Sequence, residues 1–599
     1  MNELAKFLSG FFFALILLNI CILLSGWLPV NFMGIVFDMN LWTSALIVFL
    51  FFSMFFAFLG WGTSKGKKAS SSLFIVFLLF VLGATFYLFE NPREYKASLT
   101  ETIKEEFKVL EINPEDVEFN GNKEFTISIG NEKNDSGTSI VIDNDENIIT
   151  AGYFQGTIDL DPGIGVMEKT SLGGSINNNA IDIYLAKYTQ GGRLIWGFSL
   201  GSVGADTVNS LKTDKEGNIY LTGYFGGQMD VDPTAQEKLI NSSTGRDAFL
   251  IKYNKDGKLM WVKSFGNPET IPFSLADSRF EESMDIDIDD NGNVYLIGVY
   301  DDIIDLDDSD GNKFSDTFTA YDRDTFVAKF DLQGNFIKAI SISGKGITQG
   351  QAIKVDKDGN IYVSGFFDGK ISLDGNTTLT SAGSFDCFIA KYNKDFSLVF
   401  SKRWGGSQAD KVNIGAIDLD QNNNIYVSGE FNSSLYLGDF KITSKGNTDI
   451  FFVKFNNQGK VVFAKSIGGP YNDSCFKIKT DKENNIFLTG YFKDTVDFDA
   501  GKGVYFLQSN SFGEASDVFL AKYSFDEDFV WARNFGGYVS LADEIQSGYG
   551  LAIDSSNSPI IVGKFYDQVD FHSTEELNMI SAGKGDAFLV KYNQDGEIE

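Results

Sequence analysis

A phrase of ten residues recurs seven times in this chain of 599 residues. Asp opens each copy, polar turn residues follow, and a short apolar run ends on Gly, as in DKDGNIYVSG. The copies begin at Asp143, Asp214, Asp289, Asp356, Asp420, Asp481 and Asp554, and their closing glycines are spaced by 71, 75, 67, 64, 61 and 73 residues. Such spacing is typical of one supersecondary unit repeated along the chain, so each copy must bury its apolar face against its neighbours.

A second phrase follows each first one, as in DIYLAKY from Asp182 and DAFLIKY from Asp247. In the second unit the strand-like runs lie at 208–212, 218–225, 248–253 and 258–265, separated by turns rich in Asp, Asn and Gly. Four short antiparallel strands in each of seven units predict an all-β fold, a seven-bladed β-propeller of four-stranded blades.

The two ends of the repeat array predict how the ring closes. The seventh unit ends soon after Tyr592 without a fourth strand, while a spare strand-like run at 124–130 precedes the first unit. We expect this run to join the last blade and close the ring. Deletion of 124–130 should therefore destabilise the whole domain.

These phrases, with the apolar strand that follows them, resemble the SBBP repeats of bacterial β-propeller proteins over about residues 124–599. The sequence departs from the pattern at Glu146, where Gly is common, and at Ser558-Pro559, where Asn-Ile is expected. The resemblance implies a propeller in a bacterial surface or envelope protein and says little about activity. It does not extend to the N-terminal region.

Three apolar stretches precede the repeats, at 7–28, 41–60 and 73–89. None contains a charged residue, and each is long enough to cross a hydrocarbon core as a helix. We therefore expect three transmembrane α-helices that form an anchor or a docking bundle.

The loops beside these stretches predict the topology. Lys6 precedes the first stretch and three lysines lie within 65–68, so the positive-inside rule places the N-terminus in the cytoplasm. We expect a multi-pass protein of the inner (cytoplasmic) membrane, with the chain after Glu90 on the periplasmic or extracellular side. Two alternatives are a cleavable signal peptide and a lipoprotein anchor at Cys21.

The predicted domains are a three-span transmembrane region at 1–92, a helical stalk at 93–123 and the propeller at 124–599. Ser98 and Glu101 form a capping box at the start of the stalk, which has apolar residues at the spacing of a short amphipathic helix.

The charge balance excludes several classes of function. The chain has 50 Lys plus Arg against 81 Asp plus Glu, for a net charge of -31, which makes nucleic acid an unsuitable partner. One His and three Cys argue against a His-based metal centre and a disulfide framework.

Acidic pairs follow several of the second strands in an Asp-x-Asp pattern. Alternation would place both carboxylates of a pair on one face of an extended segment, where they could share a Ca²⁺ ion. The alternative is a solvated acidic edge that discourages strand pairing. The candidate calcium ligands are Asp159, Asp161, Asp230, Asp232, Asp305, Asp307, Asp497 and Asp499.

No catalytic constellation is found in the sequence, and we predict that the protein is not an enzyme. The Asp that opens each second phrase recurs in every unit, which indicates a structural role because a catalytic group is needed only once. We interpret His572 as an exposed loop residue, Cys387 as a small buried side chain, and the Trp residues of the last strands as core.

These observations favour a membrane-anchored envelope protein that presents a propeller for protein or polymer recognition, with a protein or polysaccharide partner. Two alternatives stay open. One is an accessory subunit of a membrane transport or secretion complex that docks through its helices. The other is a polysaccharide-active hydrolase or lyase with carboxylates on one propeller face.

Overall fold

The computed structural model describes residues 125–163, 165–172, 180–234, 236–243, 245–267, 281–307, 317–509, 516–537, 545–571 and 578–599. Within these residues no helix has the length and apolar character needed to cross a membrane. The three stretches predicted to cross the membrane, the predicted stalk at 93–123 and His572 lie outside the described residues.

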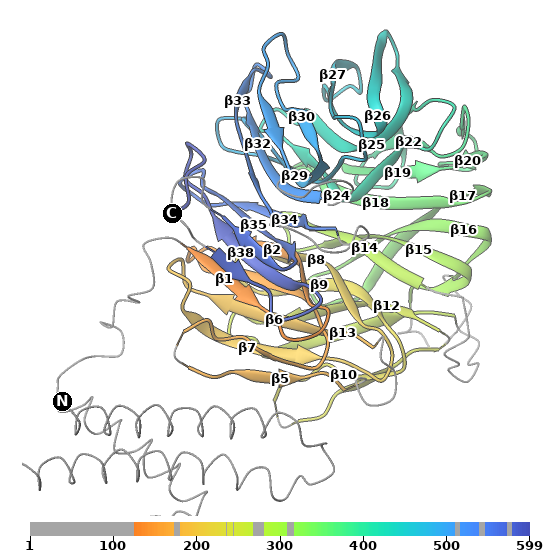
Figure 1. Ribbon diagram of the computed structural model, residues 1–599. Helices are drawn as coiled ribbons and strands as arrows, with labels where there is room; N and C mark the ends of the chain where they lie inside the picture. Colours follow the sequence, from red (N-terminus) through yellow and green to blue (C-terminus); the bar gives the residue numbers. More distant parts are fainter. Residues whose placement is uncertain are drawn as a thin grey trace, which may run out of the picture. The chain divides into compact units, whose positions relative to one another are not determined.

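The described chain forms seven antiparallel blade sheets arranged as a propeller (Figure 1). Six of them contain four strands, and in the third blade the four strands are extended by a short hairpin of the fourth blade. The predicted all-β seven-bladed propeller of four-stranded blades is confirmed. The first strands are β2 (Ser136–Ile142), β8 (Thr207–Thr213), β14 (Glu281–Ile288), β18 (Thr348–Val355), β24 (Lys411–Leu419), β28 (Ser474–Thr480) and β34 (Ser547–Ile553). The second strands are β3 (Ile148–Phe154), β9 (Ile219–Phe225), β15 (Val294–Asp305), β19 (Ile361–Phe367), β25 (Ile425–Leu437), β29 (Ile486–Lys493) and β35 (Pro559–Phe565).

The outer half of each blade comes from the second phrase and the strand after it. The third strands are β6 (Asp182–Tyr188), β12 (Asp247–Tyr253), β16 (Thr317–Phe330), β22 (Asp386–Tyr392), β26 (Phe440–Phe455), β32 (Ser516–Tyr523) and β38 (Asp586–Lys591). The fourth strands are β7 (Leu194–Leu200), β13 (Leu259–Phe265), β17 (Phe336–Lys345), β23 (Leu398–Trp404), β27 (Val461–Ile467), β33 (Phe529–Phe535) and β1 (Thr126–Ile129).

Burial explains why the phrases have the composition they do. The second and third strands are the central strands of each blade, and they are buried on both faces. Their sequences are therefore nearly continuous apolar runs. The first strands contact one another in sequence around the ring, and the last, β34, returns to β2. The first strands therefore surround the propeller axis.

The ring is closed by β1, which pairs antiparallel with β38 as the fourth strand of the last blade. Gly130 follows β1, and a Cβ there would lie 2.2 Å from the carboxyl carbon of Asp586. The glycine after the fourth strand of the first blade, Gly201, approaches Asp182 in the same way, at 2.0 Å from a carboxylate oxygen. The glycine that ends the predicted closing strand at 124–130 therefore packs against the repeated Asp of its blade, as Gly201 does in the first blade.

The turn between the first and second strands requires a left-handed residue. Gly217 has a φ of 78°, and in the first blade Glu146 takes the same kind of conformation with a φ of 60°. The departure from the repeat pattern at Glu146 therefore changes the residue but not the turn.

Five short hairpins that the sequence analysis did not predict lie between second and third strands. They pair β4 (Thr157–Asp159) with β5 (Glu168–Thr170), β10 (Gln228–Asp230) with β11 (Leu239–Asn241), β20 (Lys370–Ser372) with β21 (Thr378–Thr380), β30 (Thr495–Asp497) with β31 (Phe506–Gln508), and β36 (Gln568–Asp570) with β37 (Asn578–Ile580). In the third and fifth blades the long second and third strands pair at the same place.

Candidate functional site at the propeller axis

The first acid of each predicted calcium-binding pair is the last residue of a strand, β4, β10, β15 or β30, and the second acid lies just beyond that strand. Asp230 Oδ1 accepts hydrogen bonds from the backbone N–H groups of Asp232 (3.1 Å) and Lys238 (2.9 Å). Asp159 and Asp497 accept the equivalent pairs of bonds in their own hairpins, and Asp305 accepts one from the N–H of Asp307. Each first Asp therefore stabilises the turn of its hairpin.

The second carboxylates of these pairs stabilise the same loops. Asp161, Asp232 and Asp499 each accept a hydrogen bond from the backbone N–H two residues later. Within the described ranges, no group of three or more His, Cys, Asp or Glu side chains is arranged to hold a metal ion. Calcium binding by these pairs stays a prediction.

The residue between the two acids belongs to the core. Leu160, Val231 and Phe498 are fully buried, and their carbonyl groups accept hydrogen bonds from the buried hydroxyls of Tyr188, Tyr253 and Tyr523. Asp230 also forms a β-bridge with Gly201 at the end of the preceding blade. The backbone of Asp230 thus takes part in pairing with the preceding blade. The alternative of a solvated acidic edge that discourages pairing with other strands stays open.

The repeated Asp of the second phrase holds backbone together. Asp247, Asp386 and Asp586 are buried, and each accepts a hydrogen bond from the backbone N–H four residues earlier. This hydrogen bond, shared by three of the blades, supports the structural role inferred from the repetition of the Asp.

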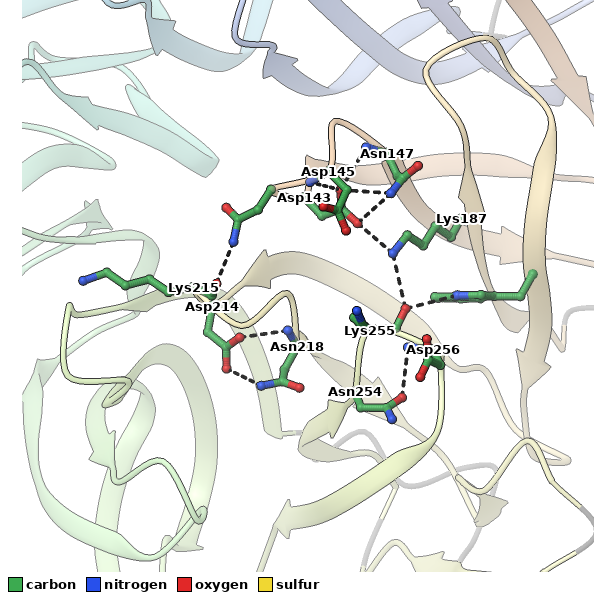
Figure 2. A network of polar contacts seen from close by, with 12 residues as sticks. Asp143, Asp145, Asn147, Lys187, Asp214, Lys215, Asn218, Asn254, Lys255 and Asp256 are labelled. Atoms are coloured by element: carbon green, nitrogen blue, oxygen red, sulfur yellow. Dashed lines mark hydrogen bonds and ion pairs between the residues drawn. The ribbon is translucent and has the colours of Figure 1, made fainter. Parts of the chain in front are cut away.

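The repeated Lys of the second phrase joins the turns of neighbouring blades (Figure 2). Lys187 Nζ lies 2.7 Å from Asp143 Oδ2 in its own blade and donates a 3.3 Å hydrogen bond to the carbonyl of Lys255 in the next. Lys252 makes the equivalent ion pair with Asp214 at 3.3 Å. We call the side of the propeller that carries these turns the turn face.

The Trp residues of the fourth strands also link blades. The indole N–H groups of Trp196, Trp261 and Trp531 donate to carbonyls in the turn that follows the third strand of the next blade. Cys387 is fully buried, and burial raises the pKa of its thiol well above the usual value, as expected for a small core side chain. These residues belong to the packing of the propeller.

A different set of residues, five of them charged, lies around the axis at the penultimate position of each first strand. We call this set the axial ring. In chain order it contains Val141, Lys212, Asp287, Lys354, Asp418, Lys479 and Ala552. Five consecutive blades thus alternate Lys and Asp, while the blades on either side of the closure supply apolar residues.

Ion pairs connect neighbouring members of the axial ring. Lys212 Nζ lies 3.1 Å from Asp287 Oδ1, and Lys354 Nζ lies 3.1 Å from Asp418 Oδ1. Lys479 reaches the same oxygen of Asp418 at 3.9 Å. The side chains of the five charged members are 12–23% exposed, so they are mostly buried but still reached by solvent.

The aspartates of the ring also bind the backbone of the next blade. Asp287 Oδ2 accepts the N–H of Val355 at 2.8 Å, and Asp418 Oδ2 accepts the N–H of Thr480 at 2.8 Å. A first strand is the edge of its sheet and leaves N–H groups without a ladder partner. The aspartates satisfy these groups, which explains their position on the axis.

Asp285 and Lys477 form a second tier, each two residues before a member of the ring. Asp285 accepts hydrogen bonds from Ser210 Oγ (2.7 Å) and the N–H of Ile353 (3.0 Å). Lys477 Nζ donates to the carbonyl of Ile414 at 2.7 Å.

A bulge in β24 brings that carbonyl to the axis. The pairing of β24 with β25 shifts between Val412 and Ile417, and Gly415 within the bulge has a φ of 66°. A Cβ on Gly415 would lie 2.4 Å from Lys477 Nζ and 3.7 Å from Asp285 Oδ1. Side chains from the third and sixth blades therefore meet the backbone of the fifth blade at this point.

We call the axial ring and the second tier together the axial cluster. The pKa values of its charged members fall into two groups. Burial alone would raise the pKa of Asp418, but the charges of Lys354 and Lys479 lower it to about 2. Burial, with the nearby charges of Lys354 and Lys212, lowers the pKa of Lys479 to about 7 despite Asp418. Burial lowers that of Lys477 to about 8, with the charge of Asp285 opposing and those of Lys212 and Lys354 assisting.

The axial cluster was not predicted from the sequence, although the sequence contains a pattern that indicates the ring. Two residues before the opening Asp of the first phrase, the five central copies carry Lys212, Asp287, Lys354, Asp418 and Lys479 in alternation. Reading the charge at one repeat position across the copies would have found the ring. The second tier depends on the bulge at Gly415 and has no such signal.

No family model matches the chain. The chain is 22% identical over 545 residues to an uncharacterized WD repeat-containing protein of Acanthamoeba polyphaga mimivirus, covering 78% of this chain and 38% of that one. It is 25% identical over 162 residues to the regulatory protein FlaEY of Caulobacter vibrioides, covering 26% of this chain and 17% of that one. The chain thus spans less than half the length of these relatives.

Solved structures give more distant likenesses. An ulvan lyase of polysaccharide lyase family PL25 is 12% identical with a TM-score of 0.36, over 76% of this chain and 97% of its own. A protein of unknown function from Bacteroides caccae is 12% identical with a TM-score of 0.29, over 59% of this chain and 89% of its own. At these TM-scores neither likeness carries an argument. The seven blades and the distant WD repeat relative support a propeller repeat protein.

Proposed function

We propose that this protein is a membrane-anchored binding protein of the SBBP-repeat type, which uses its propeller to recognise a protein or polymer partner outside the cytoplasm. The three apolar stretches of the N-terminal 92 residues would hold it in the inner membrane, with the N-terminus in the cytoplasm. In this proposal the chain catalyses no reaction.

The axial cluster is the observation that carries the binding role. The other charged positions common to the blades hold turns and strands in place, as Asp247 and Lys187 do. Asp287 and Asp418 of the axial ring also bind backbone, but the ring varies from blade to blade, with lysines and an apolar Ala552 at equivalent positions. A cluster of charges that the architecture does not require in every blade is suited to recognising a charged group of a partner.

Cysteine labelling in spheroplasts tests the topology. Cys387 and Cys475 are buried, so a membrane-impermeant maleimide should not reach them in the folded propeller. Lys215→Cys, on the turn face, should be labelled in intact spheroplasts, whereas Ser64→Cys, in the second predicted loop, should be labelled only after lysis. Labelling of Lys215→Cys only after lysis would place the propeller in the cytoplasm.

Crosslinking of the tagged full-length protein in its native membrane tests the binding role. Quantitative mass spectrometry should find a partner or polymer enriched above a tagged control membrane protein. Absence of any enriched protein or glycan would contradict the binding role. Turnover of a glycan by the purified protein would instead support the alternative of a polysaccharide-active enzyme.

A further inference from the structure

The ammonium groups of β28 have hydrogen-bonding capacity that the described protein atoms do not use. An ammonium group has three N–H donors. Lys477 uses one of them, on the carbonyl of Ile414 at 2.7 Å. Lys479 Nζ makes no hydrogen bond within the part of the chain that the structure describes, and its ion pair with Asp418 is long at 3.9 Å. Asp418 is already bound more closely by Lys354 at 3.1 Å.

The charge of the cluster is also unbalanced. The ring and the second tier together contain four lysines and three aspartates: Lys212, Lys354, Lys477 and Lys479 against Asp285, Asp287 and Asp418. The alternation begins and ends on Lys, and the two blades between Lys479 and Lys212 contribute Ala552 and Val141. The two end members of the alternation, Lys212 and Lys479, therefore have a carboxylate neighbour in the ring on one side only.

Solvent reaches this part of the axis. The side chains of Lys479 and Lys212 are 23% and 22% exposed, more than those of Lys354 and Asp418 at the other side of the ring. The ring lies one residue from the end of each first strand, next to the turn face. A small solute can approach the two lysines from that face.

We propose that the propeller axis binds a small oxyanion, a sulfate, phosphate or carboxylate group, between Lys479 and Lys477 of β28 and Lys212 of β8. The oxyanion would accept the unused N–H donors and neutralise the surplus charge. Charge-assisted hydrogen bonds of this kind are short and about twice as strong as neutral ones. The site goes beyond the proposed function, because it takes a free anion whether or not a macromolecule is bound.

Binding at this site is coupled to protonation. The pKa values of Lys479 and Lys477, about 7 and about 8, are low because burial and the neighbouring lysines disfavour their charged forms. The charged groups that face them are Lys212 of β8, Asp285 of β14, Lys354 of β18 and Asp418 of β24. A bound anion stabilises the charged forms of both lysines and so raises both pKa values. Near pH 8 the protein therefore takes up protons when the anion binds.

Calorimetric titration of the full-length protein in detergent with sodium sulfate tests the site. Sulfate is divalent throughout the relevant pH range, so any proton uptake comes from the protein. We expect saturable binding above that of sodium chloride at matched ionic strength. Near pH 8, the heat should differ between two buffers of different ionisation enthalpy.

Three variants identify the residues. Lys479→Gln should weaken sulfate binding by at least about tenfold, since it removes a charged donor. Lys215→Gln, at an exposed lysine of the turn face paired with Asp290, should bind as the wild type does. Lys479→Arg should retain binding and lose part of the buffer-dependent heat, because Arg stays protonated.

Three results would overturn the proposal. They are absence of saturable sulfate binding, equal binding by the wild type and Lys479→Gln, and a loss of binding in Lys215→Gln as large as in Lys479→Gln. If Lys479→Gln does not fold, Lys479→Arg alone decides: binding with an unchanged buffer-dependent heat would exclude proton uptake by Lys479. Failure of this site would leave the crosslinking result for a macromolecular partner intact.

Discussion

Lys354 Nζ lies 3.1 Å from Asp418 Oδ1 across the boundary between the fourth and fifth blades. Asp418 in turn accepts the backbone N–H of Thr480 in the sixth blade, at 2.8 Å. One carboxylate therefore joins three consecutive blades at the axis. The side chains of this pair are 14% and 12% exposed, so solvent screens their interaction only in part.

Removal of one partner should be costly because the other is left in a shielded site. We expect Lys354→Met to lower the free energy of unfolding by about 1–3 kcal/mol. Lys215→Met breaks the ion pair with Asp290, whose side chains are 66% and 63% exposed, and should cost less than about 1 kcal/mol. Denaturant unfolding of the two variants measures the difference. Equal losses would show that the axial pair is no stronger than a surface pair.

Ring closure depends on the space that Gly130 leaves for Asp586. We expect Gly130→Ala to destabilise the propeller by about 1–3 kcal/mol, because the added Cβ would overlap the carboxyl group. Gly191→Ala is the matched control, since a Cβ at Gly191 has no atom within 4 Å. Thermal unfolding compares the two variants. An unchanged midpoint for Gly130→Ala would contradict closure by β1.

The buried carboxyl groups predict how stability depends on pH. Burial raises the pKa of Asp182, Asp206 and Asp410 to about 7 and that of Asp473 to about 8. Their folded pKa values exceed the unfolded value, so the folded state binds more protons. The stability that they contribute is present below about pH 4 and is lost as the pH rises through 7 to 8.

Asp182→Asn isolates one of these groups. Asp182 Oδ2 accepts the N–H of Leu172 at 2.8 Å, and Oδ1 has no hydrogen-bond partner among the described residues, so an amide can replace the neutral acid. We expect the variant to match the wild type at about pH 5 and to exceed it by about 1–3 kcal/mol at about pH 7. Asp145→Asn, at an exposed turn, is the control. A variant that follows the wild-type pH profile would contradict the raised pKa.

The hairpin acids give opposite expectations for calcium and for turn stabilisation. If Asp230 serves its turn, Asp230→Asn should keep the midpoint of thermal unfolding, because Oδ1 still accepts the N–H groups of Asp232 and Lys238. Asp230→Ala should lower the free energy of unfolding by about 1 kcal/mol. We expect no rise in the wild-type midpoint on adding millimolar calcium. A rise that Asp230→Asn abolishes would establish a calcium site instead.

The fold followed from the sequence because the repeat encodes it many times over. The second-unit runs at 208–212 and 248–253 correspond to β8 and β12 within a residue or two at each end. The short hairpins were missed because strands such as β10 have only three residues, too few to show alternation. Their pairing with a preceding blade is a tertiary contact.

The candidate site was harder to predict because its members are far apart in the chain. The contact of Lys477 with Ile414 and its proximity to Asp285 exist only because the blades form a ring and β24 bulges at Gly415. Asp159 and Asp161 form an obvious local pair in the sequence. Their carboxylate oxygens, however, accept backbone hydrogen bonds within the hairpin. Local spacing indicates turn chemistry more readily than a cluster around an axis.

The central claim is that the axial cluster is where the propeller recognises its partner. The most direct test is crosslinking in native membranes with the full-length wild type, Lys477→Gln/Lys479→Gln and Lys215→Gln, at equal expression and with quantitative mass spectrometry. The account predicts that the partner is lost from the double variant and retained by Lys215→Gln. Equal capture by all three proteins would contradict it and would direct the search to the N-terminal region or the hairpins.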